Sequence, residues 1–379
     1  MRSGSPDFSD YPRPAGERTA TMHDMPNDRT LSPVFVHSWW RTSSTYVWFK
    51  LRQNPSLCCY YEPLHEVVGH LTLDLVRFKP SPELFKLANH PVMERDNYAE
   101  YEPLILAGGI PFHKELSYDR YFLLPGEADP ALEAYLETLI RSAGAANQRP
   151  VMAFCRSSLR AASMRRRFGG LHIAIVRNPR DQWGSMLEQA SRGGLYFQAG
   201  VLAIASRLRT RFPRAFAHLP CALPDHRGRR YNPDELKHYH AMATRERPSN
   251  IYAVLVLIWL ASALQLLSAC DVVIDSDRLS ADAQARAGTE ARLAREGLPV
   301  DFSDYATPRH PRLPLAPDAL DSIEAAAIHA LSRNARPLAV YHPERINAHL
   351  ASLAPSNARL VRLALDALRA APRQAPLAS

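Results

Sequence analysis

The chain has 379 residues, of which 46% are apolar and 22% are charged, with 46 Lys and Arg against 38 Asp and Glu. This composition is typical of a globular protein and excludes a fully disordered chain, a collagen-like repeat and a disulfide-stapled miniprotein. The net charge of +8 favours anionic partners such as phosphates, sulfates or acidic glycans. The basic residues are scattered without an aromatic–basic stripe, so nucleic acid is not an expected partner.

The cysteines and the N-terminus indicate the compartment. The five cysteines are odd in number and form no C-x-x-C pair, which favours a reducing environment and gives no reason to expect a bound metal. The first thirty residues are polar and contain no apolar signal-peptide core, so we expect a flexible segment over 1–30. Together with the Arg/Ala/Pro-rich composition, these features predict a bacterial cytoplasmic protein.

Short apolar runs alternate with helical patterns along the chain. The predicted strands are Val34–His37, Leu57–Tyr61, Val151–Cys155, Leu171–Val176 and Val272–Ile274. The predicted helices between them are Ser44–Arg52, Leu159–Phe168 and Gln182–Gln189. Most of the strands are continuously apolar, which is typical of a parallel sheet covered on both faces. The alternation therefore predicts an open α/β sheet.

The remaining segments complete a predicted main domain over 31–350 and a helical tail over 351–379. Two stretches with mixed signals, about 67–149 and 192–250, are predicted to be insertions that build a pocket or a lid, the second with a loop at Leu219–Asp234. Thr307–Pro317 holds four prolines and predicts an irregular crossing. Ala-rich helices are expected at Pro317–Arg333 and Asn357–Ala371.

The stretch from Ile251 to Cys270 has no charged residue and is long enough to cross a bilayer. A buried helix is the preferred interpretation, because polar residues such as Gln265 interrupt it and the strand-like Asp271–Asp275 follows at once. We therefore expect no stable membrane span.

The pentapeptide Asp-Phe-Ser-Asp-Tyr occurs twice, at Asp7–Tyr11 and at Asp301–Tyr305. Two copies of five residues do not make a repeat architecture. From the sequence alone, the duplication is taken as coincidence.

The first chemical signal lies between Val34 and Tyr46, where an apolar strand ends, a hydroxyl-rich turn follows and a helix begins. This geometry directs backbone N–H groups and the positive end of a helix dipole at one spot. Arg41 adds a forked cation. The hydroxyl donors are Thr42, Ser43, Ser44 and Thr45. The segment predicts an oxyanion site, although a Ser/Thr-rich helix cap has the same pattern. The G-x-x-x-x-G-K-[ST] spacing of the ATPase loop is absent.

A second signal runs from Ile173 to Ser185, where a strand again ends in a charged turn and a helix starts after Pro179. Arg177 follows the strand at its carboxyl end, where open α/β sheets bind ligands. Ser185 lies about two helical turns further on. The arginine and the hydroxyl could therefore hold one phosphate, and a surface Arg–Asp turn is the plainer alternative.

Together the two segments resemble the sulfotransferases that use 3′-phosphoadenosine 5′-phosphosulfate (PAPS). In that family a strand–loop–helix holds the 5′-phosphosulfate, and a later Arg with a Ser eight residues beyond it holds the 3′-phosphate. Arg41–Thr45 is similar to the first motif, and Arg177 with Ser185 to the second. The resemblance extends from about Val34 to Leu279 and is dense in roughly forty residues. It implies a P-loop NTPase-like three-layer α/β/α fold and a PAPS-dependent O-sulfotransferase that needs no metal.

The motif style is closer to the carbohydrate and tyrosylprotein branches of the family than to the branch that acts on small phenols. The tyrosylprotein enzymes place a catalytic glutamate twenty-one residues after the motif arginine, and Glu62 stands twenty-one residues after Arg41. The resemblance therefore implies Glu62 as the base, with His65 and His113 as alternatives. The donor would be held by Arg41, by the segment Thr42–Tyr46, and by Arg177 and Ser185.

Several points depart from the family or stay open. Ser43 replaces the family's motif glycine, the loop has no lysine, so Arg41 carries its charge, and no segment matches the Gly-rich donor loop of the small-phenol branch. A glycan acceptor is favoured on motif style, with protein tyrosine and small alcohols as alternatives. A P-loop kinase or regulator is the alternative of a different class. Trp39, Trp40 and Trp183 flank the motifs, where they either pack in the core or touch the adenine.

Overall fold

The structure is a computed structural model that describes residues 32–79, 81, 93, 95–124, 126–192, 194–217, 219–224, 233–306, 313–334 and 341–371. The predicted flexible segment 1–30, which includes Asp7–Tyr11, lies outside the described residues. The same holds for residues 225–232 of the predicted loop and for residues 307–312 of the predicted proline-rich crossing.

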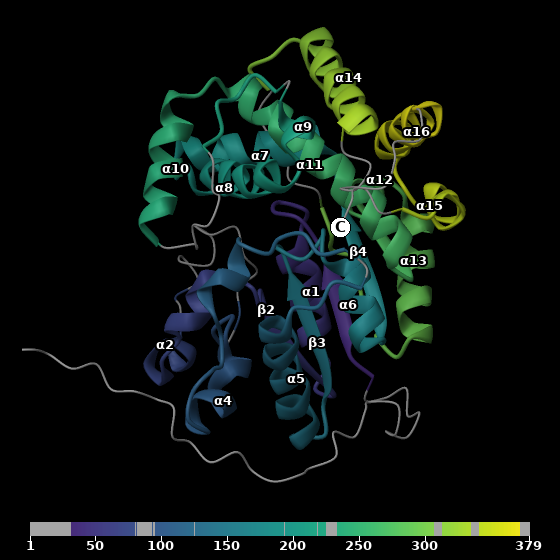
Figure 1. The fold of residues 1–379 in the computed structure, drawn as a ribbon. Coiled ribbons are helices and arrows are strands. Elements are labelled where there is room, and N and C mark those ends of the chain that lie inside the picture. The colour runs from purple at the N-terminus through teal and green to yellow at the C-terminus, as the bar shows by residue number, and fades with distance from the viewer. Residues whose placement is uncertain are drawn as a thin grey trace, which may run out of the picture.

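A five-stranded, all-parallel sheet forms the centre of the fold (Figure 1). Its strands are β1 (Val34–His37), β2 (Leu57–Tyr61), β3 (Arg149–Phe154), β4 (Leu171–Val176) and β5 (Val272–Asp275), in the order β2-β3-β1-β4-β5. In the central strand, Val36 pairs with Ala153 of β3 on one side and with Ile173 of β4 on the other. All five predicted strands are confirmed, three of them with the predicted bounds.

Alternate residues of each strand are buried on opposite faces of the sheet, because successive strand side chains point in opposite directions. In β1, Val34 and Val36 belong to an apolar cluster with residues of α1 (Ser44–Arg52) and α13 (Ala283–Arg295). Phe35 between them belongs to a second cluster with residues of α5 (Pro130–Ala145) and α6 (Ala161–Phe168). Helices therefore cover both faces, which confirms the predicted α/β architecture.

The helices account for most of the remaining described chain. They are α1 (Ser44–Arg52), α2 (Leu73–Arg77), α4 (Glu102–Leu106), α5 (Pro130–Ala145), α6 (Ala161–Phe168), α7 (Pro179–Ser191), α8 (Tyr196–Arg211), α9 (Pro213–Phe216), α10 (Pro233–Arg245), α11 (Pro248–Ala269), α12 (Ser276–Ala281), α13 (Ala283–Arg295), α14 (Pro317–Asn334), α15 (Pro343–Leu350) and α16 (Pro355–Ala370). Helix α1 has its predicted bounds, and α6, α7, α14 and α16 lie within a few residues of the predicted ones.

Both predicted insertions contain long helices that were not predicted from the sequence. In α8, residues 198–208 are buried without interruption, so the helix lacks the polar face that produces a helical period. Helix α5 does carry such a period, since its buried residues are Leu132, Tyr135, Leu136, Leu139 and Ala143. Asp129 caps α5 by accepting the N–H of Leu132 at 3.3 Å.

Helix α11 contains the long apolar stretch and is, among the described residues, the one helix long and apolar enough to cross a membrane. Its apolar window is buried throughout, and it packs against α6, α8 and α14. The stretch therefore forms a core helix in this fold, as the preferred interpretation of the sequence requires.

The order of the strands marks one place as the expected ligand site. From β1 the chain continues through α1 to β2 on one side of the sheet, and from the neighbouring β4 it continues through α7–α11 to β5 on the other side. Open α/β sheets bind ligands where the strand order reverses in this way, at the carboxyl ends of the strands. In Figure 1 this end of the sheet faces the layer of helices that contains α7 and α8.

Candidate active site

The loop between β1 and α1 has a strained backbone at two residues. Arg41 has a φ of 63° and Ser43 a φ of 66°, both in the left-handed region that non-glycine residues rarely adopt. Ser43 is the N-cap of α1, and its side chain makes no capping hydrogen bond. The conformation that glycine adopts readily is thus present here with serine. Strain of this kind gathers at functional sites.

The hydroxyl groups of this loop mostly bind other parts of the protein. Thr42 donates to the carbonyl of Trp39 at 2.9 Å, and Ser44 Oγ lies 3.2 Å from Cys155 Sγ. Three contacts reach other hydroxyl or carboxylate groups: Ser43 lies 2.8 Å from the hydroxyl of Tyr305, and Thr45 lies 3.0 Å from the hydroxyl of Tyr61. The hydroxyl of Tyr46 donates to Asp304. These contacts hold the loop in shape. Any anion at the start of α1 would therefore be held chiefly by the backbone N–H groups of Ser44 and Thr45, because the N–H of Tyr46 already donates to the carbonyl of Ser43 at 3.1 Å.

The two predicted binding segments meet in space. The Nε of Arg41 donates to Ser185 Oγ at 2.7 Å, although the two residues are 144 positions apart. Arg177 donates through Nη1 to the carbonyl oxygen of Arg41 at 3.0 Å. The structure therefore brings Arg41, Arg177 and Ser185 together at the carboxyl ends of the adjacent strands β1 and β4.

Two guanidinium groups lie close together at this point. Burial and, next, the charge of Arg177 lower the pKa of Arg41 from its ordinary value. Arg177 itself is 2% exposed. Like charges repel strongly where water is scarce, so the pair creates a strongly positive spot that an anion would relieve.

Asp277 opposes this positive charge. One of its oxygens lies 3.7 Å from Arg177 Nε, and the other accepts the N–H of Asn178 at 2.7 Å. Burial and the nearby Asp275 raise the pKa of Asp277 to about 6. The carboxylate therefore competes for Arg177 at neutral pH and loses its charge under mildly acidic conditions.

Asp277 makes the stability of the fold depend on pH. Its folded pKa of about 6 lies above the unfolded value of about 3.9, so its contribution is present below pH 4 and is lost as pH rises through 6. We expect Asp277→Asn to raise the free energy of unfolding by up to about 2–3 kcal/mol at pH 8, and much less at pH 4.5. Urea unfolding at both pH values measures the difference. An equal effect at both would contradict the assignment.

Trp40, just before Arg41, packs against helix α8. A Cβ added to Gly200 would lie 2.6 Å from Trp40 Cη2, and the ring of Trp40 is buried. We expect Gly200→Ala to destabilise the fold by about 1–3 kcal/mol, because the ring must shift. The matched control is Gly288→Ala in α13, where a Cβ meets open space and helix propensity predicts a gain of up to about 1 kcal/mol. Thermal unfolding of both variants decides the sign.

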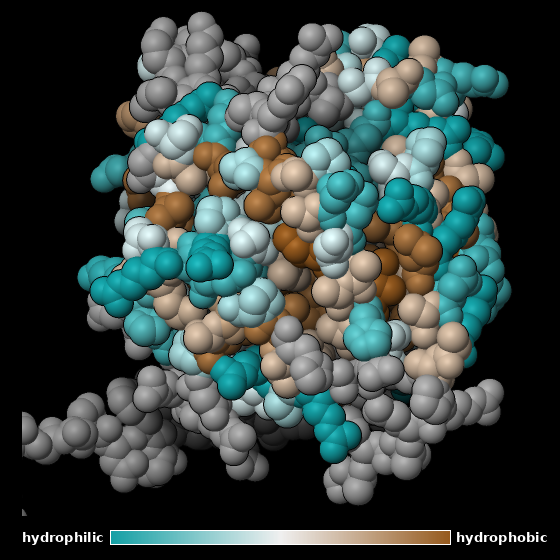
Figure 2. Space-filling model, turned by 90° about the horizontal axis from the view of Figure 1, so that it is seen from above, coloured by the Kyte–Doolittle hydropathy of each residue, from teal (hydrophilic) through white to brown (hydrophobic). Residues whose placement is uncertain are grey.

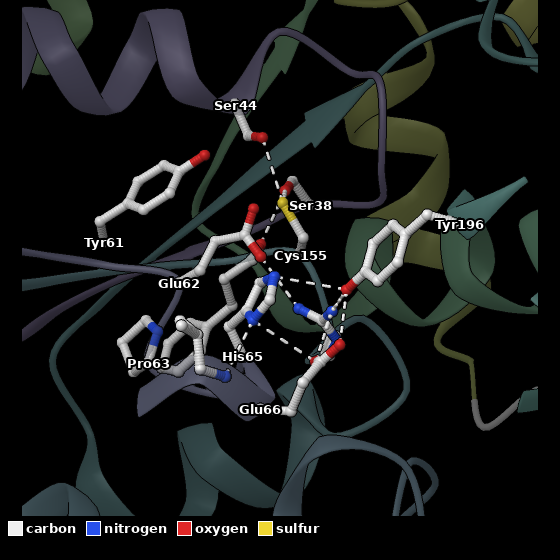
Figure 3. A network of polar contacts seen from close by, with 12 residues as sticks. Ser38, Ser44, Tyr61, Glu62, Pro63, His65, Glu66, Cys155 and Tyr196 are labelled. Atoms are coloured by element: carbon white, nitrogen blue, oxygen red, sulfur yellow. Dashed lines mark hydrogen bonds and ion pairs between the residues drawn. The ribbon is translucent and has the colours of Figure 1, made fainter. Parts of the chain in front are cut away.

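Glu62 follows β2 directly and has a φ of 38°, a third positive value at the same end of the sheet. Its carboxylate accepts a hydrogen bond from Arg156 Nη1 at 2.9 Å. Cys155 links this residue to the loop between β1 and α1, because its thiol lies 3.2 Å from Ser44 Oγ, and burial and, next, the charge of Glu62 raise the pKa of the thiol. Figure 3 shows Glu62 beside Cys155 and Ser44.

Arg156 organises the acidic side of the site. It is 1% exposed and also donates to Glu66 at 2.9 Å and to the hydroxyl of Tyr196. Burial opposes its charge, yet Tyr196 and Glu66 raise the pKa of Arg156 above its ordinary value. Its guanidinium lies over the rings of Trp40, at 5.3 Å, and Tyr118, at 5.4 Å. Arg156 therefore stays charged and holds Glu62 in one orientation.

The two alternative bases, His65 and His113, lie in different surroundings. His65 Nδ1 accepts the N–H of Val67 at 3.1 Å, so the proton of the neutral ring belongs on Nε2, which lies 3.3 Å from the hydroxyl of Tyr196. Burial and the charge of Arg156 lower the pKa of His65. A neutral His65 in this geometry has no free lone pair for an incoming proton. His113 is exposed in the first predicted insertion.

The aromatic residues near the motifs are part of the core. Trp39, Trp40 and Trp183 are each at most 3% exposed and belong to one apolar cluster. Seen from above, the surface has brown hydrophobic patches near the middle of the view, with hydrophilic residues among and around them (Figure 2). The core-packing interpretation of the three tryptophans is confirmed.

Sequence reasoning missed Arg156, Tyr196 and the role of Asp277. Arg156 lies two residues after the end of β3, and Arg177 directly follows the end of β4, so the same strand-end signal could have found Arg156. Tyr196 begins α8, which lay in a segment without a recognised pattern.

Comparison of the chain with protein-family models, with curated proteins and with solved structures returned no match. Within the described ranges, no group of three His, Cys, Asp or Glu side chains is arranged to hold a metal ion.

Proposed function

We propose that this protein is a PAPS-dependent O-sulfotransferase with a P-loop NTPase-like three-layer fold. One observation supports the proposal most strongly. Arg41, after β1, lies in contact with Arg177 and Ser185, which follow β4, although the two segments are far apart in sequence. The contact forms a positive spot where the strand order reverses. A donor that carries two phosphates on one nucleoside needs positive groups from two segments such as these.

The donor is assigned to the two motif segments. The first turn of α1 and Arg41 hold the 5′-phosphosulfate, because unpaired helix N–H groups and a guanidinium favour an anion. Arg177 and Ser185 hold the 3′-phosphate. Ser185 Oγ accepts from Arg41, which leaves its own hydrogen to donate.

Glu62 is assigned as the base. The acceptor oxygen forms a bond to sulfur while the bond from sulfur to the 5′-phosphate oxygen breaks, and 3′-phosphoadenosine 5′-phosphate (PAP) leaves with the electron pair. The ion pair with Arg156 holds Glu62 in place, and Glu62 takes the proton of the acceptor hydroxyl. Arg41 stabilises the charge that develops on the leaving phosphate.

A glycan is the favoured acceptor, with protein tyrosine and small alcohols as alternatives. Partly buried aromatic side chains near Glu62 come from both predicted insertions, Tyr98 from the first and Tyr196 with Phe197 from the second. Flat apolar rings with hydroxyl groups suit sugar rings and phenols alike.

Ligand-induced thermal stabilisation tests the donor class. PAP at a hundred times its dissociation constant should stabilise the fold by about 2.7 kcal/mol. Stabilisation by ATP–Mg and not by PAP would favour a kinase or nucleotide-dependent regulator instead. Incubation with labelled PAPS and a panel of glycans, tyrosine peptides and alcohols then identifies the acceptor.

A further inference from the structure

The second copy of the duplicated pentapeptide, Asp301–Tyr305, docks on the helix that begins at the candidate site. The hydroxyl of Tyr305 lies 2.8 Å from Ser43 Oγ, and its ring lies 4.9 Å from the ring of Tyr46. Asp304 accepts hydrogen bonds from Tyr46 and, at 2.9 Å, from Lys50.

The docking site contacts the pentapeptide mainly through its side chains. Phe302 is fully buried, its ring lies 5.9 Å from that of Tyr46, and Tyr305 is 7% exposed. Asp304, by contrast, has a side chain that is 63% exposed beside a buried Lys50. The phenylalanine, the second aspartate and the tyrosine of the pentapeptide therefore make the contacts, and the same three side chains recur in the N-terminal copy as Phe8, Asp10 and Tyr11.

We infer that the N-terminal copy, Asp7–Tyr11, binds the docking site formed by Ser43, Tyr46 and Lys50 in exchange with Asp301–Tyr305 of the same chain. The exchange replaces each contact with one from an identical side chain. The contact energies of the two copies therefore nearly cancel, and chain connectivity decides the balance between them. This inference concerns docking alone and does not depend on the proposed transfer reaction.

The linker between the N-terminal copy and β1 is long enough for the copy to reach the docking site. Twenty-two residues, Pro12 to Pro33, separate it from β1, and they span roughly 70 Å at full extension. The four residues of β1 cover only about 13 Å, and α1 starts seven residues after β1 ends. The site is thus within reach of the segment in the same molecule.

The exchange has a consequence for the candidate active site. Ser43 is both the left-handed N-cap of α1 and the partner of Tyr305. Whichever copy is bound holds Ser43 in its strained conformation, whereas an empty docking site removes that support. The two copies are therefore alternative supports for the same loop.

Peptide binding to the full-length chain tests the inference. The chain carries Phe8→Ala and Tyr11→Ala to remove its own N-terminal copy, and the probe is a fluorescein-labelled peptide with the sequence of residues 5–12, followed by fluorescence anisotropy. We expect saturable binding that is weaker to the wild-type chain, whose own copy competes. A peptide of the same composition in scrambled order is the control.

Two further variants identify the site. Asp304→Asn loosens the resident copy and should strengthen peptide binding by roughly two- to five-fold. In the Asp304→Asn background, where the resident copy no longer uses the Lys50 cation, Lys50→Met should weaken peptide binding by a similar factor. A peptide with Asp10→Asn should no longer respond to Lys50→Met. Absence of peptide binding, or binding indifferent to both variants, overturns the inference. A wild-type dimer that dissociates on Phe8→Ala/Tyr11→Ala also overturns it, because the segment then acts between copies.

Discussion

Replacing Glu62 by glutamine is expected to lower turnover by roughly a hundred- to ten-thousand-fold while PAP still binds. Glutamine keeps an oxygen that can accept from Arg156, so the orientation of the side chain is preserved. What disappears is the ability to take the acceptor's proton. Turnover with labelled PAPS and the best acceptor of the panel, together with PAP affinity by calorimetry, measures both halves of the expectation.

Glu66→Gln is the matched control for Glu62→Gln. Glu66 also pairs with Arg156 at 2.9 Å, and it accepts from the hydroxyl of Tyr196 at 2.8 Å. Its loss removes the same negative charge from Arg156 without removing the proposed base. A similar fall in both variants would assign the effect to the charge balance of Arg156. Unaltered turnover in Glu62→Gln would remove Glu62 from the role of base.

Replacing Arg177 by alanine is expected to weaken PAP binding by about 2 kcal/mol or more, roughly thirty-fold. The guanidinium is buried, so water does not readily replace its contact with the phosphate. Arg177→Ala also removes the cation beside Asp277. The PAP affinity of the double variant Asp277→Asn/Arg177→Ala should therefore be compared with that of Asp277→Asn alone. That background separates the loss of the phosphate contact from the burial of an unpaired carboxylate.

Arg180→Ala is the control for Arg177→Ala. Arg180 lies three residues further, in the first turn of α7, but its side chain pairs with Glu324 at 2.6 Å and with Asp321, away from Arg41. This variant should keep its PAP affinity even where it costs stability. The donor assignment would be falsified if Arg177→Ala retained full PAP affinity, or if both variants lost it equally.

The strands and the first helix were predictable because their signals are local. β1, β2 and β4 are short apolar runs bounded by polar turns, and α1 follows a hydroxyl-rich segment directly. Helix α8 was not predictable in the same way, because a helix buried on all sides has no polar face and therefore no period. Helix α5 was missed although its buried residues do recur at helical spacing.

The candidate site was predictable only residue by residue. Arg41, Glu62, Arg177 and Ser185 were identified from strand-end position and motif resemblance. Their mutual geometry was not, because the hydrogen bond from Arg41 to Ser185 joins residues 144 positions apart. Arg156 went unnoticed despite its place just after a strand, since its meaning depends on the carboxylates that surround it.

The amino-acid sequence alone determined the α/β class, the strand positions and the two arginine-bearing turns, since each depends on residues adjacent along the chain. Only the tertiary structure decided the order of the strands, the convergence of Arg41 with Arg177, the acidic partner Asp277 and the docking of Asp301–Tyr305 on α1. Those features arise from contacts between distant segments, which form when apolar faces are buried together and which no local pattern encodes.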